Sequence, residues 1–152
     1  PVLCKDFFID TYQVYLAKSF GADAILIILA AVNENTAKGI YKVAEELNMT
    51  TIIETHTDTE AKKALDYKNA IIGINNRNLK TLKTDIKTTY DLYKVLAKHS
   101  GPLVCESGIK SEKEVEEIVK KTKINNFLIG ESLLKDLDQN SSLLKRILQI
   151  TK

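Results

Sequence analysis

Short apolar runs alternate with amphipathic stretches along this chain, and this alternation constrains its fold more than any other feature. The apolar runs are rich in Ile, Val and Leu without polar alternation, which is typical of parallel strands buried on both faces. We expect strands at Val2–Cys4, Ala24–Leu29, Thr51–Glu54, Ala70–Ile74, Leu103–Cys105 and Phe127–Ile129. We expect helices at Thr11–Phe20, Thr36–Leu47, Asp58–Tyr67, Thr88–Lys98, Ser111–Lys121 and Ser141–Leu148. The pattern therefore predicts six consecutive βα units.

Polar residues stand where several of these helices should begin. Ser111 and Glu114 have the spacing of a capping box, and Asp10, Thr36 and Asp58 occupy candidate N-cap positions. Repeated βα units imply a parallel sheet covered by helices through right-handed crossovers. No linker or shift in composition divides the chain, so we expect residues 1–152 to form a single domain.

Two architectures satisfy this pattern: an open doubly wound sheet and a (β/α)8 barrel. A complete barrel needs about 250 residues, so 152 residues can hold only part of one. The chain also begins at Pro1, without Met, directly in an expected strand, which predicts a truncated N-terminus. In the barrel alternative, the first two βα units are missing.

The residues that follow the strands discriminate between the two architectures. Charged or amide side chains follow most of the apolar runs, in Lys5-Asp6, Glu54-Thr55-His56, Asn75-Asn76-Arg77, Glu106-Ser107-Gly108 and Gly130-Glu131-Ser132. In a barrel the carboxyl ends of all strands ring one mouth, where active sites are built. In an open sheet, ligands gather at a switch point between only a few strands. Polar groups spread over many strands therefore favour the barrel.

Three of these residues are candidate catalytic groups. Lys5 can serve as an acid or as a Schiff-base amine, although a strand-end lysine can also simply reach water. Glu54 and Glu106 could face Lys5 across the mouth, where a carboxylate orients a lysine or takes a proton. Each could instead be a cap or a salt-bridge partner at the edge of the sheet.

Other strand-end residues are candidate binding groups. Asn75 can orient a substrate hydroxyl or carboxylate, and Arg77, one of two Arg among 22 basic residues, can clamp an anion. The alternative for this segment is a turn. Glycines in Ser107-Gly108 and Gly130-Glu131-Ser132 would let backbone N–H groups approach a phosphate. Barrels frequently hold a phosphate after strands seven and eight.

Several classes of protein and site are not supported. The net charge of +2 is too balanced to indicate a nucleic-acid binder, and the longest apolar run, Ala24–Val32, is too short to span a membrane. Two His and two Cys without metal-ligand spacing predict no metal site. Neither a nucleotide-binding fingerprint nor a nucleophile elbow occurs, so we expect no cofactor.

The His and Cys residues have ordinary alternatives to chemistry. His56 lacks an obvious partner, so we expect it in a structural or loop role. Cys4 and Cys105 lie inside expected strands, so we expect them to be small buried apolar groups and not nucleophiles. Two cysteines without a secretory leader favour a reducing cytoplasm.

Four segments resemble one enzyme family, the indole-3-glycerol phosphate synthases. Pro1–Phe7, with Ile9-Asp10 and Tyr12–Tyr15, resembles the third βα unit of that family. Ile72–Leu79 resembles its sixth strand and loop, and Cys105–Ile109 and Phe127–Leu133 resemble the seventh and eighth. The segments occur in the order of the family and cover essentially the whole chain.

The resemblance implies a (β/α)8 TIM barrel of tryptophan biosynthesis. Such an enzyme converts 1-(2-carboxyphenylamino)-1-deoxyribulose 5-phosphate into indole-3-glycerol phosphate, carbon dioxide and water. Lys5 would be the general acid that protonates the substrate carbonyl, with Glu54, Asn75 and Glu106 as further catalytic groups. The resemblance implies substrate-binding roles for Phe7, against the anthranilate ring, Arg77, near the substrate carboxylate, and Ser107. It implies phosphate binding, chiefly through backbone N–H groups, at Ser107, Gly108, Gly130 and Glu131, with the Glu131 carboxylate pointing away.

The missing units set the largest departure from the family. A Lys and a Glu of the first βα unit contribute to catalysis in the family, and that unit is absent here. Six units leave two unpaired sheet edges, so we expect the chain alone to fold poorly and to lack synthase activity. Besides the phosphorylated substrate, the resemblance implies fusion to, or association with, other tryptophan-pathway enzymes as candidate partners.

Two other functions remain open. One is a different phosphate-binding barrel such as phosphoribosylanthranilate isomerase, whose chemistry uses a Cys and an Asp. The motif Lys5-Asp6-Phe7 argues against it. The other is a non-catalytic partial-barrel module that only binds a partner.

Overall fold

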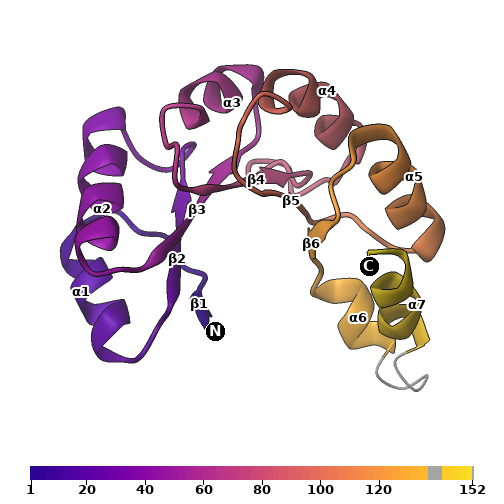
Figure 1. The fold of residues 1–152 in the computed structure, drawn as a ribbon, viewed down its shortest axis with the longest axis horizontal. Coiled ribbons are helices and arrows are strands. Elements are labelled where there is room, and N and C mark those ends of the chain that lie inside the picture. Colours follow the sequence, from indigo (N-terminus) through magenta and orange to yellow (C-terminus); the bar gives the residue numbers. More distant parts are fainter. Residues whose placement is uncertain (137–141, 152) are drawn as a thin grey trace.

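The computed structural model describes residues 1–136 and 142–151, which form a curved sheet of six parallel strands with helices along its outer face (Figure 1). The strands are β1 (Leu3–Cys4), β2 (Ala24–Ile28), β3 (Thr50–Thr55), β4 (Ile71–Asn75), β5 (Leu103–Glu106) and β6 (Asn126–Leu128). The helices are α1 (Tyr12–Ser19), α2 (Glu34–Glu46), α3 (Asp58–Ala64), α4 (Lys87–Leu96), α5 (Glu112–Thr122), α6 (Glu131–Asp136) and α7 (Ser142–Ile150). All six expected strands are confirmed, and each end lies within one residue of its predicted position.

The strands pair in the order of the sequence, from β1 at one end of the sheet to β6 at the other. Every pair is parallel. In Figure 1 the sheet bends into an arc whose two ends do not meet, and no pairing joins β1 to β6 within the described residues. The expected fold class, an incomplete (β/α)8 barrel, is therefore confirmed.

The two faces of the sheet bury different sets of residues. Ile25 and Ile27 of β2 belong to the large core between the strands and the helices. Leu26 and Ile28, which point the other way, form a second cluster with Ile52 on the concave face. Burial on both faces explains why these strands show no polar alternation in the sequence.

The register of the strands determines which polar residues join the concave face. Glu54 pairs with Ile28 on one side and with Gly73 on the other. Asn75 pairs with Glu106 in the next step of the ladder. Because residues in register share a face, and residues two apart on one strand do too, Glu54, Asn75 and Glu106 all project into the concave side at the carboxyl ends of their strands.

The helix starts were predicted less well than the strands. The capping box of Ser111 and Glu114 is confirmed. However, Asn33 and Thr57 cap α2 and α3, so the expected caps Thr36 and Asp58 were wrong by three residues and one residue. Asp10 is not the N-cap of α1 either, because that position belongs to Thr11.

The last part of the chain contains one helix that the sequence pattern did not predict. Gly130-Glu131-Ser132 was expected as a loop, but Glu131 and Ser132 form the first turn of the short helix α6. The expected helix Ser141–Leu148 corresponds to α7, although Ser141 itself lies outside the described residues. Across the described ranges, no helix is long and apolar enough to cross a bilayer.

Candidate active site

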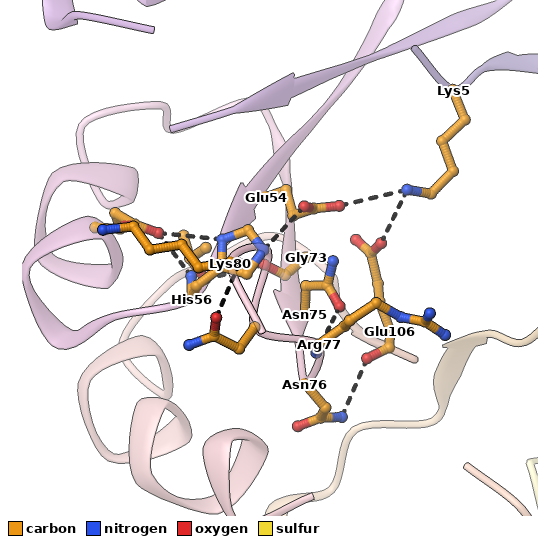
Figure 2. A network of polar contacts seen from close by, with 12 residues as sticks. Lys5, Glu54, His56, Gly73, Asn75, Asn76, Arg77, Lys80 and Glu106 are labelled. Carbon is orange, nitrogen blue, oxygen red and sulfur yellow. Dashed lines mark hydrogen bonds and ion pairs between the residues drawn. The ribbon is translucent and has the colours of Figure 1, made fainter. Parts of the chain in front are cut away.

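Lys5 lies between two buried glutamates at the carboxyl ends of β1, β3 and β5 (Figure 2). Its Nζ atom is 3.4 Å from Oε2 of Glu54 and 3.7 Å from Oε2 of Glu106. The two glutamate side chains are each 1% exposed, whereas the Lys5 side chain is 41% exposed. The ammonium group therefore connects a buried pair of carboxyl groups to the open mouth of the curved sheet.

Glu54 is surrounded by groups that favour its ionised form. Burial alone would raise the pKa of Glu54, but hydrogen bonds from His56 and Asn75 and the charge of Lys5 outweigh burial and lower the pKa to about 2. At neutral pH this side chain is a carboxylate.

Glu106 has the opposite environment. Burial and the neighbouring negative charge of Glu54 raise the pKa of Glu106 to about 8, against the opposing charge of Lys5. Neither carboxyl oxygen of Glu106 has a hydrogen-bond partner within the described residues. Two carboxyl groups whose pKa values are driven apart in this way are suited to different roles in acid–base chemistry.

Gly73 leaves the space that the carboxyl group of Glu106 occupies. A Cβ atom at position 73 would lie 2.0 Å from Oε1 of Glu106 and 3.3 Å from Cγ2 of Ile52. Because Gly73 pairs with Glu54 on β3, any side chain there would point into the concave face between the two glutamates. The glycine therefore allows Glu106 to approach Glu54.

A cavity of about 710 Å³ opens at this mouth. Nine of the ten residues expected at the site line it: Lys5, Phe7, Glu54, Asn75, Arg77, Ser107, Gly108, Gly130 and Glu131. The tenth, Glu106, does not line the cavity and contacts Lys5 from a fully buried position. The cavity thus brings the lysine together with the glycine turns that follow β5 and β6.

Arg77 and Glu131 meet across the mouth of the cavity. An Nη atom of Arg77 is 3.5 Å from Oε2 of Glu131, whose other oxygen lies 2.8 Å from Nζ of Lys135. The carboxylate of Glu131 is thus held by two cations, which also lower its pKa. Both side chains are partly or largely exposed, so the pair is open to exchange with a bound anion.

The turn after β5 has an unusual backbone and a buried anchor that was not expected. Ser107 and Gly108 have φ values of +64° and +78°. The side-chain amide of Asn76 donates to the backbone oxygens of Glu106 and Ser107, both at 3.1 Å. Because the peptide unit is planar and trans, the N–H of Gly108 points opposite to the Ser107 carbonyl, away from Asn76. This orientation suits the turn to present a donor to the cavity that Gly108 lines.

His56 had no evident partner in the sequence, but the structure gives it two. Its Nε2 atom lies 3.2 Å from Oε1 of Glu54, and its Nδ1 atom lies 3.3 Å from Oε2 of Glu60. The spacing of His56 and Glu60, four residues apart across the start of α3, was a signal in the sequence that could have predicted their contact. No group of three or more His, Cys, Asp or Glu in the described ranges is arranged to hold a metal ion.

A family model described as indole-3-glycerol phosphate synthase matches residues 1–145. The chain belongs to the indole-3-glycerol phosphate synthase family. The similarity in Lys5-Asp6-Phe7 and in the three later segments is therefore part of a match over nearly the whole chain.

Two indole-3-glycerol phosphate synthases and one tryptophan biosynthesis protein are similar to most of this chain. The indole-3-glycerol phosphate synthase of Polynucleobacter asymbioticus is 43% identical over 143 residues, which are 94% of this chain and 53% of the relative. The synthase of Prochlorococcus marinus is 39% identical over 95% of this chain and 50% of its own length. The tryptophan biosynthesis protein TrpCF of Buchnera aphidicola is 45% identical over 88% of this chain, which spans 29% of that longer protein. The chain thus spans about half the length of the synthases that it matches.

Solved structures with low sequence identity share the fold. A mutant tryptophan synthase α-subunit from Pyrococcus furiosus superimposes with a TM-score of 0.69 at 18% identity, over 99% of this chain and 64% of that chain. Tryptophan synthase from M. tuberculosis gives a TM-score of 0.67 at 11% identity, over 93% and 55%. For this member of the synthase family, these similarities support the architecture of a partial barrel.

Proposed function

We propose that this chain carries the general acid and the phosphate-binding turns of an indole-3-glycerol phosphate synthase. The reaction converts 1-(2-carboxyphenylamino)-1-deoxyribulose 5-phosphate into indole-3-glycerol phosphate, carbon dioxide and water. One observation carries the proposal: the Lys5 ammonium group, held by two buried carboxyl groups, lines the same cavity as Gly108 and Gly130.

Ring closure is the first chemical step. The aromatic carbon that bears the carboxylate attacks the ketone carbon, and the ketone oxygen takes a proton from Lys5 and becomes a hydroxyl group. Glu54, 3.4 Å from the ammonium, orients it before the step. General acid catalysis of this kind contributes about 10²–10⁴-fold to a rate.

Loss of carbon dioxide and water completes the reaction. The bond to the carboxylate breaks, and its electron pair restores the aromatic ring as carbon dioxide leaves. The new hydroxyl group then leaves with a proton as water while an adjacent carbon gives up a proton, so this step needs an acid and a base. The raised pKa of Glu106 beside the lowered pKa of Glu54 supports assigning this cluster to proton transfer.

The remaining cavity residues bind the substrate in this proposal. Phe7 lies against the anthranilate ring, Asn75 beside the reacting centre, and Arg77 near the substrate carboxylate, where it can exchange its contact with Glu131 for the ligand. The phosphate occupies the turns at Ser107-Gly108 and at Gly130-Glu131, held by backbone N–H groups. The Gly108 N–H, which the Asn76 anchor turns away from the buried side, is the donor that this geometry supports best.

The test uses a completed barrel, in which this chain follows the part of the Polynucleobacter asymbioticus synthase that precedes its matched region. We expect this protein to form indole-3-glycerol phosphate, measured by the appearance of indole fluorescence, and to show no turnover of phosphoribosylanthranilate. A folded completed barrel without synthase turnover would contradict the proposal. Turnover of phosphoribosylanthranilate instead would favour the isomerase, and retention of synthase activity on Lys5→Met would remove the role given to Lys5.

A partner enzyme is part of the same proposal. The TrpCF protein of Buchnera aphidicola contains a region similar to this chain within a much longer sequence. We infer that this chain acts beside other tryptophan-pathway enzymes. Co-purification of a tagged completed barrel with such an enzyme from the source cells supports the inference, and purification without one contradicts stable association.

A further inference from the structure

His56 contacts Glu54 at the end of β3 (Figure 2). Its ring also contacts a second carboxylate, that of Glu60 in the first turn of α3. The imidazole is only 10% exposed, and the Glu60 side chain is 17% exposed. The backbone N–H of His56 also donates to Oε2 of Glu60 at 2.7 Å. Backbone and ring thus bind the same oxygen, which fixes the ring relative to the strand.

Both ring nitrogens of His56 face carboxylate oxygens. Nδ1 lies 3.3 Å from Oε2 of Glu60, and Nε2 lies 3.2 Å from Oε1 of Glu54. A neutral imidazole has one lone pair, which would face a negative oxygen in either tautomer. Between two ionised carboxylates, the arrangement therefore favours the imidazolium form, with a proton on each nitrogen.

This cation acts on one glutamate of the active-site pair more than on the other. Glu54 receives His56 on one oxygen and Lys5 on the other. Among the described residues, the cation in ion-pair contact with Glu106 is Lys5, at 3.7 Å, and Glu106 otherwise lies beside the negatively charged Glu54. The two carboxyl groups therefore differ because, of the two, His56 contacts Glu54 alone. Neither His56 nor Glu60 lines the cavity, so this contact lies outside it.

We propose that His56, held as an imidazolium by Glu60, is a positioning residue that keeps Glu54 ionised and in place, so that Glu106 is the member of the pair that carries the proton beside Lys5. The proposal rests on the proposed function, because it assigns proton states within that catalytic cluster. His56 touches neither the cavity nor Lys5 in this arrangement and acts through Glu54.

The charges around His56 agree with this assignment. Burial alone would lower the pKa of His56, but hydrogen bonds to Glu54 and Glu60 and their negative charges raise it to about 9. Across Glu54, the other charged groups of the cluster are Lys5 and Glu106. Burial would also raise the pKa of Glu60, yet its contacts with His56 lower it.

The first experiment observes the imidazole directly in the unmutated completed barrel. The chain has two histidines, so His99→Gln identifies the resonances of His56 in a ¹⁵N spectrum. We expect both ring nitrogens of His56 to be protonated at pH 7.5, with a titration midpoint near 9. A neutral tautomer at pH 7.5 overturns the proposal.

The second experiment compares the pH dependence of kcat in His56→Gln with that in His99→Gln. Without the His56 charge the pKa of Glu54 rises, so the acid limb of the profile should move up by about 1–3 pH units, while KM stays within about threefold. His99, which contacts the Ala70 carbonyl, should leave the limb in place. A folded His56→Gln protein with an unmoved acid limb contradicts the proposal, because a purely structural role would change only its stability.

Glu60→Gln provides a readout if His56→Gln does not fold. It removes one of the two carboxylates at the ring, so the titration midpoint of His56 should fall toward its ordinary value of about 6.5. An unchanged titration midpoint of His56 would contradict the proposal that Glu60 holds the imidazolium. If the completed barrel turns over no substrate, the proposed function fails, whereas the resonances of His56 still decide whether His56 is an imidazolium.

Discussion

The mouth of this partial barrel has two parts that work by different physical means. On one side, Lys5, Glu54 and Glu106 form a cluster in which side-chain charges, burial and spacing determine the chemistry. On the other, the turns at Ser107-Gly108 and Gly130 offer backbone groups whose direction depends on φ values and on anchors such as Asn76. We expect changes in the cluster to alter turnover and pH dependence, and changes in the turns to alter binding.

Replacement of Lys5 should give the largest effect. Lys5→Met in the completed barrel removes the proton donor but preserves much of the apolar length, so we expect kcat to fall about 10²–10⁴-fold with little change in KM. Lys98→Met, at an exposed position outside the cavity lining, is the control and should leave both constants unchanged. If Lys5→Met raises KM and leaves kcat unchanged, Lys5 acts in substrate binding and not in proton transfer.

Replacement of Gly73 should give the next largest effect, through Glu106. A Cβ atom 2.0 Å from Oε1 forces the Glu106 carboxyl group out of its position, which we expect to destabilise the protein by about 1–3 kcal/mol and to lower kcat about tenfold or more. The matched control is Gly39→Ala in α2, where the nearest atom is at 3.7 Å and alanine favours the helix by about 0.5–1 kcal/mol. Urea unfolding and steady-state kinetics measure both effects. Equal behaviour of the two variants would show that Glu106 does not depend on the space at Gly73.

Replacement of the turn glycines should change substrate binding, whereas replacement of residues in the charged cluster should change turnover. Gly108→Ala places a side chain at φ +78° and 3.1 Å from Cβ of Thr84, so we expect KM to rise by about tenfold, equivalent to about 1.4 kcal/mol, with kcat nearly unchanged. Gly130→Ala meets no atom within 4 Å and has no positive φ, so its effect should be small. If Gly108→Ala lowers kcat and leaves KM unchanged, the turn does not act through substrate binding.

The sequence predicted the strands and the residues at their ends, but not every helix cap. Local patterning was sufficient for the strands, because burial on both faces demands continuous apolar runs, and strand ends such as Glu54 and Asn75 follow from them. The sequence did not predict the caps Asn33 and Thr57, since several capping residues compete near each helix start.

Contacts that depend on three dimensions were also missed. The space at Gly73 depends on the register of β3, β4 and β5, and the anchor at Asn76 depends on how β4 meets the turn after β5. The partners of His56 depend on how α3 starts beside the strand end. The roles of the expected site residues stay predictions, although nine of those residues share one cavity.

The pH dependence of stability should show the smallest difference between the two sides. A raised pKa, as in Glu106 and His56, gives stability that is complete below the ordinary pKa and is lost as the pH rises through the folded value. For Glu106 the loss extends from about pH 4.5 to about 8, and for His56 from about 6.5 to about 9. The lowered pKa of Glu54 has the opposite sign, so its contribution is lost only as the pH falls from about 4.5 to about 2. Each group contributes a slope of at most about 1.4 kcal/mol per pH unit.

Urea unfolding of the completed barrel between pH 5 and 9 measures these slopes. We expect the free energy of unfolding to decrease with pH over this range, and Glu106→Gln to remove most of the decrease below pH 7 because its side chain cannot ionise. Gly108→Ala, in the turn region, should lower stability by the same amount at every pH. A Glu106→Gln protein that keeps the full slope would mean that Glu106 is already ionised at neutral pH in the folded state. Both carboxyl groups beside Lys5 would then be ionised at neutral pH, and the proposed division of acid and base roles between them would fail.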